Sequence, residues 1–451
     1  MKTLRFNWYL ILAAFVLLSI STTACDENDD NNLNEPEEEE TNTIVDIAVS
    51  ESSFTILVEA LAKANLVSTL NGSTEYTVFA PTNTAFQALL NNLGATSLND
   101  ISTDDLTEIL LYHVVSGSNA SSSLSSGYYA SMSEKEDGYY YSIYFNKEDL
   151  MVNGSAKVTQ ADVMADNGVI HIIDKVILPP SITDHAIANP ALSNLTAAVV
   201  KAELAGTLDD DDNNFTVFAP TDDAFAMLFQ DLSATLDDLD KEALTPILLY
   251  HVIDDFVPAA QVTSGYVNAL AMGQENYLSM NIEVSNSAVM VNGATVVLTD
   301  VVATNGIVHV IDKVILPNTV VDLAINNSAF SILVEAVVKA ELDETLSGEG
   351  PYTVFAPTNT AFKALFTALG VSGVADLSKE TLTPILLAHV VSGNVRSTDL
   401  SNGTVPTLNT EKTISIDISN GVTIDSEINV IIANVQGTNG VVHAIDKVIV
   451  P

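Results

Sequence analysis

A threefold internal repeat constrains the fold of this 451-residue chain more than any other feature of its sequence. The segment YTVFAPTNTAF, which starts at Tyr76, returns twice with few changes. A second motif follows in each copy, and its histidines, His113, His251 and His389, lie 138 residues apart. Solenoid repeats are usually about 20 to 45 residues long, so this longer period describes whole domains. The sequence therefore predicts three tandem copies of one domain.

A third motif ends each copy and sets the expected domain boundaries. The segment NGVIHIIDKVILP begins at Asn167, and close variants of it end the second and third copies. We therefore expect domains at 43–179, 180–317 and 318–451. Almost no residues separate one copy from the next, which predicts stiff joints, because long Gly/Ser linkers would be flexible.

Each copy also carries local signals for helices and strands. Apolar residues from Phe54 to Leu61 recur at helical spacing, which predicts an amphipathic helix. The β-branched and aromatic run before Pro81 predicts a buried strand that this proline ends. Thr82 can then cap the next helix. The same order of signals recurs in the second and third copies.

Two further signals concern a later helix and the final hairpin. Pro246 and Pro384 predict helix starts capped by the threonines before them, because proline is favoured in the first helical turn. Asn167 and the glycine after it predict a type I′ turn, whose central residues need positive φ. The alternating side chains that follow predict a strand.

The three motifs, in this order and repeated three times, resemble the fasciclin domain family over about nine tenths of the chain. The resemblance implies a compact α+β domain in which two sheets form a β wedge flanked by helices. It also implies cell adhesion, with an extracellular matrix component, a glycan or a cell-surface protein as partner. In that family the Tyr-His segment has been linked to adhesion, so the implied binding residues are Tyr112, His113, Tyr250, His251 and His389. Alanine precedes His389, so the third copy is expected to bind less well if the tyrosine hydroxyl contributes.

The repeated histidines have a second interpretation. A histidine on an apolar helix face is more often a hydrogen-bonded core residue than a ligand. The strand histidines His171, His309 and His443 lie in a similarly apolar context. His185 lies outside the repeated positions, where we expect an ordinary surface or half-buried substitution without a role.

Six tyrosines lie between positions 128 and 144 of the first copy, among them Tyr139, Tyr140 and Tyr141. Pairing across neighbouring strands is one explanation. The other is an exposed aromatic platform for sugar rings or a protein partner, because tyrosine combines a flat apolar ring with a polar tip. The only tryptophan is Trp8, and its absence from the rest of the chain counts against a dedicated carbohydrate-binding module.

The N-terminal segment 1–24 has the features of a secretion signal. Lys2 and Arg5 precede an apolar run that is too short for a typical membrane span, and small residues follow it. The single cysteine, Cys25, comes next and resembles the lipidated cysteine of bacterial lipoproteins. We therefore expect the lipid on Cys25 to be the only membrane attachment.

The segment 25–42 is rich in acidic residues and contains no aromatic residue, so we expect a disordered tether. An acidic run directly after the cysteine resembles the surface-export signal of Bacteroidetes lipoproteins. That resemblance implies a secreted, lipid-anchored protein of the outer membrane that faces the cell exterior.

The charge balance and the missing motifs exclude several functions. Sixteen basic and 58 acidic residues give a net charge of −42, which would repel nucleic acid. The acidic run at 209–212 lacks the alternating ligands and turn glycine of a calcium loop, so we predict neither a metal site nor a cofactor. No signature of a catalytic nucleophile or phosphate loop occurs, so we expect no enzyme activity. The alternatives to adhesion are a lipoprotein that binds a polysaccharide or small ligand, and a passive envelope spacer.

Overall fold

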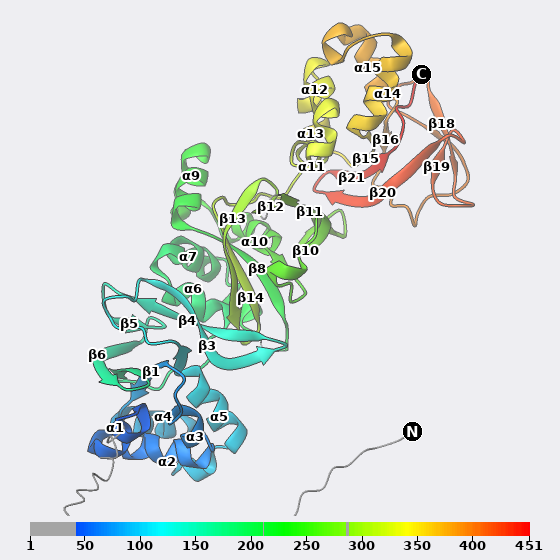
Figure 1. The fold of residues 1–451 in the computed structure, drawn as a ribbon. Coiled ribbons are helices and arrows are strands. Elements are labelled where there is room, and N and C mark those ends of the chain that lie inside the picture. Colours follow the sequence, from blue (N-terminus) through cyan, green and yellow to red (C-terminus); the bar gives the residue numbers. More distant parts are fainter. Residues whose placement is uncertain (1–41, 211, 286–287) are drawn as a thin grey trace, which may run out of the picture. The chain divides into compact units, whose positions relative to one another are not determined.

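The same order of helices and strands occurs three times along the chain (Figure 1). The structure is a computed structural model that describes residues 42–210, 212–285 and 288–451. We use the names domain 1, domain 2 and domain 3 for the elements within 44–173, 182–311 and 320–445. The predictions for the signal 1–24, for Cys25 and for the tether up to residue 41 lie outside the described residues.

Each domain has five α-helices, which gather on one side of its strands in domains 1 and 3 (Figure 1). The helices of domain 1 are α1 Ile44–Ser50, α2 Thr55–Lys63, α3 Val67–Leu70, α4 Asn83–Leu93 and α5 Thr103–Tyr112. Those of domain 2 are α6 Ile182–Ala188, α7 Ser193–Lys201, α8 Ala205–Leu208, α9 Asp222–Leu232 and α10 Lys241–Tyr250. Those of domain 3 are α11 Val320–Ile325, α12 Ser331–Lys339, α13 Asp343–Ser347, α14 Asn359–Leu369 and α15 Lys379–Leu387.

Each domain also has seven strands. Domain 1 contains β1 Tyr76–Pro81, β2 Val114–Ser116, β3 Gly127–Glu136, β4 Tyr139–Asn146, β5 Met151–Val152, β6 Ala156–Ala165 and β7 Gly168–Ile173. Domain 2 contains β8 Phe215–Pro220, β9 Val252–Ile253, β10 Gly265–Gly273, β11 Asn276–Ser285, β12 Ala288–Val291, β13 Ala294–Ala303 and β14 Gly306–Ile311. Domain 3 contains β15 Tyr352–Pro357, β16 Val390–Ser392, β17 Gly403–Pro406, β18 Thr413–Asp417, β19 Thr423–Ile424, β20 Ile428–Gly437 and β21 Gly440–Ile445.

The strands follow one order in all three domains, which in domain 1 is β2-β1-β7-β6-β5-β4-β3. In domain 1, β2 also pairs with β3 and closes the sheet into a barrel, whereas domains 2 and 3 have open seven-stranded sheets. The first strand β1 pairs in parallel with the last strand β7, and the other pairs are antiparallel. The long strand β6 has two register shifts against β7, and such bulges bend a strand. One bent strand can therefore belong to both halves of the sheet. The expected α+β fold with a two-part β wedge and flanking helices is confirmed.

The predicted helix caps after the first strand are confirmed. The Thr82 side chain accepts a hydrogen bond from the Ala85 backbone N–H at 3.3 Å, and it caps α4. Thr221 and Thr358 cap α9 and α14 in the same way. Behind each cap, an alanine and a phenylalanine of the helix are buried against the core, which fixes the direction in which the helix leaves the strand.

The prediction that Pro246 begins a helix is wrong, and so is the one for Pro384. Helix α10 begins at Lys241, where the Asp240 side chain caps it by accepting a hydrogen bond from Ala243 N–H at 2.9 Å. Pro246 therefore lies inside α10, as Pro384 lies inside α15. The polar turn before each proline has its own cap, so the helix starts one turn earlier.

The final hairpin is confirmed, but its turn is not the predicted Asn-Gly turn. Ala165 pairs with Gly168, so the turn residues are Asp166 and Asn167. Gly168 has a φ of 146°, and a Cβ there would lie 1.9 Å from the Tyr76 carbonyl oxygen. The glycine is needed for close approach of two strands.

The Asn167 side chain has a structural role of its own. Its Oδ1 accepts a hydrogen bond from Ile44 N–H at 2.8 Å, and its Nδ2 donates to the Leu70 carbonyl at 2.7 Å. Asn305 and Asn439 make the equivalent bonds in the other domains. The asparagine therefore attaches the first helix of each domain to its last hairpin.

Candidate binding regions: the Tyr-His motif and the domain joints

The tyrosine of the Tyr-His motif is buried at the end of α5. The Tyr112 side chain has 0% exposure, and its hydroxyl donates to the Ser142 carbonyl at 2.8 Å. The same hydroxyl accepts a hydrogen bond from Asn153 Nδ2 at 2.8 Å. In domain 2, Tyr250 bonds with the equivalent residues. Burial raises the pKa of both hydroxyls, so they remain neutral.

The histidine of the motif joins the helix to the segment after the last strand. His113 Nδ1 donates to the Ile109 carbonyl at 2.7 Å, and its Nε2 accepts from Ile177 N–H at 3.0 Å. His251 and His389 make the same two bonds. Burial lowers the pKa of each of the three rings to about 4. Each ring is therefore neutral and has no free nitrogen.

The third copy differs at more positions than the alanine that the sequence singles out. Ala388 replaces the tyrosine, and Asp425 follows β19 where Asn153 follows β5. By strand register, Lys412 occupies the position of Tyr141. Lys412 Nζ lies 3.2 Å from the Asp425 carboxylate, in a half-buried ion pair. The tyrosine and its asparagine partner are thus replaced together.

The strand histidines support a bend in the long strand. His171 Nε2 donates to the Asn119 carbonyl at 2.9 Å, and its Nδ1 accepts from Asp162 N–H at 3.3 Å. Asp162 has a φ of 61°, and its carboxylate accepts from Ser121 N–H at 2.7 Å. His309 and His443 form equivalent bonds with Asp300 and Asn434. No sequence pattern predicted that these three partner residues would have a left-handed backbone conformation.

The tyrosine cluster of domain 1 is largely internal. Tyr141 is 9% exposed and packs edge-on against Tyr112, with ring centroids 6.3 Å apart. Tyr128 pairs with Tyr144 across β3 and β4 at 4.9 Å. Tyr140, in contrast, is 37% exposed. The binding role of these tyrosines and of the Tyr-His motif stays a prediction.

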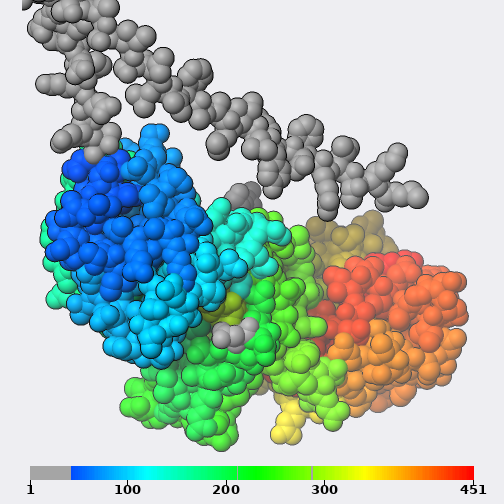
Figure 2. Space-filling model, turned by 90° about the horizontal axis from the view of Figure 1, so that it is seen from below, coloured from blue at the N-terminus to red at the C-terminus, as the bar shows by residue number. Residues whose placement is uncertain are grey.

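Domain 1 contacts domain 2 through a contact surface that we call joint 1. The Ser142 hydroxyl of β4 accepts a hydrogen bond from Val302 N–H of β13 at 3.0 Å, and both residues are buried. Tyr139 packs edge-on against Phe256 of domain 2, with centroids 5.7 Å apart. In the space-filling view, cyan atoms of domain 1 abut green atoms of domain 2 (Figure 2). Contacts of this kind make residues 42–451 one compact unit.

Domain 2 contacts domain 3 through equivalent residues, which form joint 2. The Ser279 hydroxyl accepts from Gln436 N–H at 3.0 Å, as Ser142 does in joint 1. Tyr266, at the position of Tyr128, accepts a hydrogen bond from Asn327 Nδ2 at 2.8 Å. The carbonyls that accept from the buried motif tyrosines belong to Ser142 and Ser279. The motif tyrosines therefore hold the two serines that form the hydrogen bonds across the joints.

Domain 3 lacks the equivalents of the side chains that β3–β4 of domain 1 and β10–β11 of domain 2 contribute to joints 1 and 2. By strand register, Thr404 occupies the position of Tyr128 and Tyr266, and Thr413 occupies that of the two serines. Both threonines are exposed. With Ala388, these replacements leave the third copy without the motif tyrosine, the strand tyrosine and the serine that contribute to joints 1 and 2.

His185 is not the surface or half-buried residue that the sequence suggested, because it is buried in joint 1. It is 1% exposed, and its ring packs edge-on against Tyr128 at 5.4 Å. Nε2 donates to the Val302 carbonyl at 3.1 Å, whereas Nδ1 has no hydrogen-bond partner. Burial lowers the pKa of this ring to about 4. The apolar residues at the equivalent positions, Ile47 and Leu323, were the available signal.

Two further findings concern metals and membranes. Among the described residues, no group of three histidine, cysteine, aspartate or glutamate side chains could hold a metal ion. In the acidic run, Asp209 accepts a hydrogen bond from the Thr183 hydroxyl at 2.6 Å, and Asp211 lies outside the described part. Within the same described ranges, no helix has the length and apolarity needed to cross a membrane.

Three α+β domains with one strand order and equivalent joints define a tandem-repeat protein. This chain belongs to the fasciclin family, because the Fasciclin domain matches residues 52–179, 190–317 and 328–451.

Several relatives are similar to this chain in sequence. Transforming growth factor-beta-induced protein ig-h3 of Sus scrofa is 29% identical over 425 residues, which cover 91% of this chain and 58% of that protein. Periostin of Homo sapiens is 25% identical over 414 residues, which cover 91% of this chain and 47% of that protein. The chain thus spans about half the length of these two relatives.

Two shorter matches complete the comparison. The cell surface glycolipoprotein MPB83 of Mycobacterium bovis is 40% identical over 119 residues, 26% of this chain and 49% of that protein. The solved FAS1 domain pair of the insect cell adhesion molecule Fasciclin I is 21% identical and has a TM-score of 0.38. That match covers 57% of this chain and 95% of the solved chain.

Proposed function

We propose that this protein is a lipid-anchored surface protein that mediates adhesion by binding extracellular matrix, a glycan or a cell-surface protein. The observation that carries the proposal is a repeated exposed tyrosine beside each joint. Tyr140 and Tyr277 occupy equivalent positions at the start of β4 and β11, and they are 37% and 52% exposed. Exposed tyrosines are common in binding surfaces because the ring supplies apolar area and the hydroxyl a hydrogen bond.

Repetition makes weak contacts useful. Two linked sites on one chain bind with a higher overall affinity than either site alone, provided that both can engage together. The joints hold the two tyrosine-bearing strands through buried hydrogen bonds to Val302 and Gln436. The relative named as a cell surface glycolipoprotein supports the same class of function.

The buried motif residues fit a structural contribution to adhesion. Tyr112 and Tyr250 hold the strands that carry Tyr140 and Tyr277, and the motif histidines hold the helix ends. Binding through the Tyr-His segment is therefore proposed to be indirect. An enzymatic function is not proposed, because both ring nitrogens of each motif histidine are already hydrogen-bonded.

The anchor and the orientation belong to the same proposal. Lipid on Cys25 would hold the domains at the outer membrane, and the acidic tether would place them on the outer surface. The variant Cys25→Ser should release the protein from the membrane fraction. Protease added to intact cells should cut the unaltered protein, and complete protection would contradict exterior placement.

Adhesion is tested with cells that express the full chain on surfaces coated with matrix proteins or glycans. Tyr140→Ala and Tyr277→Ala should each reduce attachment several-fold, and the double variant should reduce it further. Met227→Ala is the control, because Met227 is also exposed, at 44%, but lies on helix α9. Attachment that is unchanged in the double variant would favour a passive envelope spacer. Attachment to glycans alone would favour a polysaccharide-binding lipoprotein.

A further inference from the structure

An apolar cavity occurs at the same place in each domain, but its size differs greatly. It lies between the first three helices and the first strand, and the motif histidine lines it. Its volume is about 20 Å³ in domain 1, about 230 Å³ in domain 2 and about 100 Å³ in domain 3. The three copies thus act as internal controls for one another.

Side-chain size at two positions near the cavity differs in the same direction as the volume between domains 1 and 2. On the second helix of each domain, domain 1 has a leucine where the other two have valine. At the start of the third helix, domain 1 has valine, domain 2 alanine and domain 3 aspartate. The residues are Leu61 and Val67, Val199 and Ala205, and Val337 and Asp343. The largest cavity therefore belongs to the domain with the smallest side chains.

The wall of the domain 2 cavity is almost wholly apolar. Leu195, Leu208 and Leu248 line its interior. His251 presents a ring whose two nitrogens are already bonded to Ile247 and Ile315, so it adds no free polar group. An apolar cavity of about 150 Å³ stays dry and binds a molecule such as benzene. The larger cavity of domain 2 has room for a somewhat larger apolar group.

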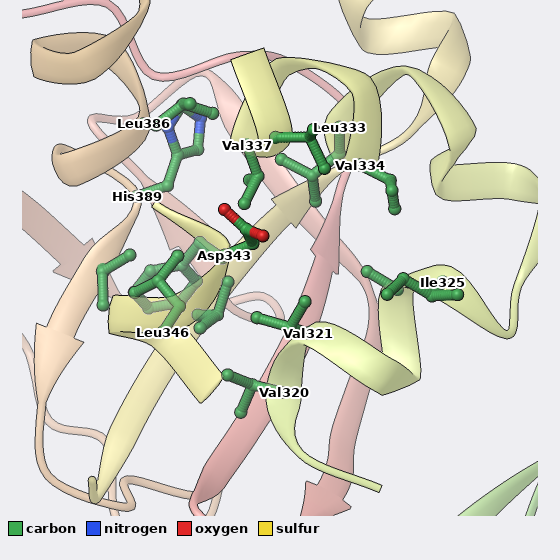
Figure 3. Close-up of a pocket in the computed structure, with 15 residues that line it drawn as sticks. Val320, Val321, Ile325, Leu333, Val334, Val337, Asp343, Leu346, Leu386 and His389 are labelled. Carbon is green, nitrogen blue, oxygen red and sulfur yellow. The ribbon is translucent and has the colours of Figure 1, made fainter. Parts of the chain in front are cut away.

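The mouth of the cavity combines apolar and acidic side chains. Ile187 and Val200 line it and are 67% and 63% exposed, which extends the apolar surface outward. Asp184 and Asp209 also line it, and no lysine or arginine does. In domain 3 the carboxylate of Asp343 points into the space beside Val337 and Leu346 (Figure 3). Both larger cavities therefore place negative charge next to an apolar interior.

We propose that the domain 2 cavity binds a small aliphatic molecule that carries an ammonium group, with a weaker second site in domain 3. The alkyl chain fills the apolar interior, and the ammonium group lies near the carboxylates at the mouth. Opposite charges attract and like charges repel at this range, so a fatty carboxylate is disfavoured. The site does not rest on the proposed adhesion, because it lies among α6, α7 and α8 rather than at Tyr140 or Tyr277.

The test uses residues 42–451, which form one compact unit, with hexylammonium and hexanoate as matched probes in calorimetric titrations. Hexylammonium should bind at least about ten times more tightly than hexanoate, and added salt should reduce this preference. Equal binding of the two probes would overturn the proposal, and so would no binding of hexylammonium.

Variants that exchange the residues of domains 1 and 2 locate the site. Val199→Leu with Ala205→Val fills the cavity with side chains that domain 1 already tolerates, and it should weaken hexylammonium binding at least ten-fold. The circular dichroism spectrum should be unchanged. The reciprocal change, Leu61→Val with Val67→Ala, should add a binding site in domain 1, and it tests the idea even if the first variant does not fold. Unchanged binding in both folded variants would overturn the assignment to this cavity.

Discussion

The two joints share one framework and differ in what surrounds it. In each, a buried serine hydroxyl on the second strand of the β3–β4 or β10–β11 pair accepts a backbone N–H from the next domain. Joint 1 surrounds this bond with aromatic and imidazole rings, including His185. Joint 2 has Leu323 at that position and adds polar bonds, such as Arg396 Nη1 to Asn276 Oδ1 at 2.6 Å. The hydrogen bond to the backbone is therefore repeated, whereas the surrounding side chains differ, so the two joints should respond differently to pH and to substitution.

The largest difference is expected under acid, because only joint 1 contains a histidine. Burial lowers the pKa of His185 from 6.5 to about 4, and the hydrogen bond to the Val302 carbonyl and the charge of Asp184 act in the opposite direction. The stabilising contribution of His185 is complete above pH 6.5 and is lost as the pH falls towards 4. At pH 4.5 joint 1 should lose about 2 to 3 kcal/mol relative to joint 2. Hydrogen exchange of the Val302 and Gln436 amides measures each joint separately.

The control for this prediction is His185→Leu, which gives joint 1 the residue of joint 2. The other buried histidines destabilise all domains under acid, so the difference between the two amides is the relevant quantity. In the variant, the Val302 and Gln436 protection factors should fall together. A difference that persists in His185→Leu would show that another group controls the pH response.

The next effect should be equal in both joints. Tyr112→Phe removes the donor to Ser142 and leaves Asn153 Nδ2 without its partner, and Tyr250→Phe does the same in domain 2. Each change should cost about 2 kcal/mol, because buried polar groups lose their bonds. Urea unfolding measures the loss, and faster exchange of the amide at the adjoining joint locates it. If only one of the two variants increased exchange at its joint, the conclusion that both tyrosines support their joints in the same way would be wrong.

The smallest difference concerns the edge of each joint. Lys135 Nζ donates to the Thr304 carbonyl at 2.5 Å and lies 5.7 Å from the centre of the Phe256 ring. In joint 2, Gln274 Nε2 reaches the equivalent Thr438 carbonyl at 3.3 Å. Lys135→Ala should cost about 1 kcal/mol, and Gln274→Ala about half as much or less. If the two variants lost equal free energy of unfolding in urea, the Phe256 ring would make no contribution to joint 1.

Local signals in the sequence predicted local structure well. Thr82 caps α4 because its hydroxyl needs only the N–H three residues later, and such a contact is readable from spacing. The turn at Asn167 was mispredicted for the opposite reason. Its amide side chain bonds Ile44 and Leu70, which are distant in sequence, so the local turn rule did not apply.

The candidate site was predictable only in part. The apolar helix face around His113 indicated a buried, hydrogen-bonded ring, and the structure places it so. Ser142 gave no signal, because its partner Val302 lies 160 positions later and in another domain. The role of Tyr277 was also missed, since its neighbours are not aromatic and only strand register relates it to Tyr140.

In each domain the first helix is attached to the last hairpin, and this contact sets the order in which parts of the chain can fold. The Ile44 N–H bonds to Asn167, which lies 123 positions later. The first helix can therefore be attached only after nearly the whole domain has been synthesised. Contacts of such long range form slowly, and domains made first tend to fold first. Val302 precedes the last strand of domain 2, so joint 1 closes only when domain 2 is almost finished. Until then, the newly folded domain 1 carries Ser142 and Tyr128 uncovered, and the protein matures by adding each finished domain to an already folded predecessor.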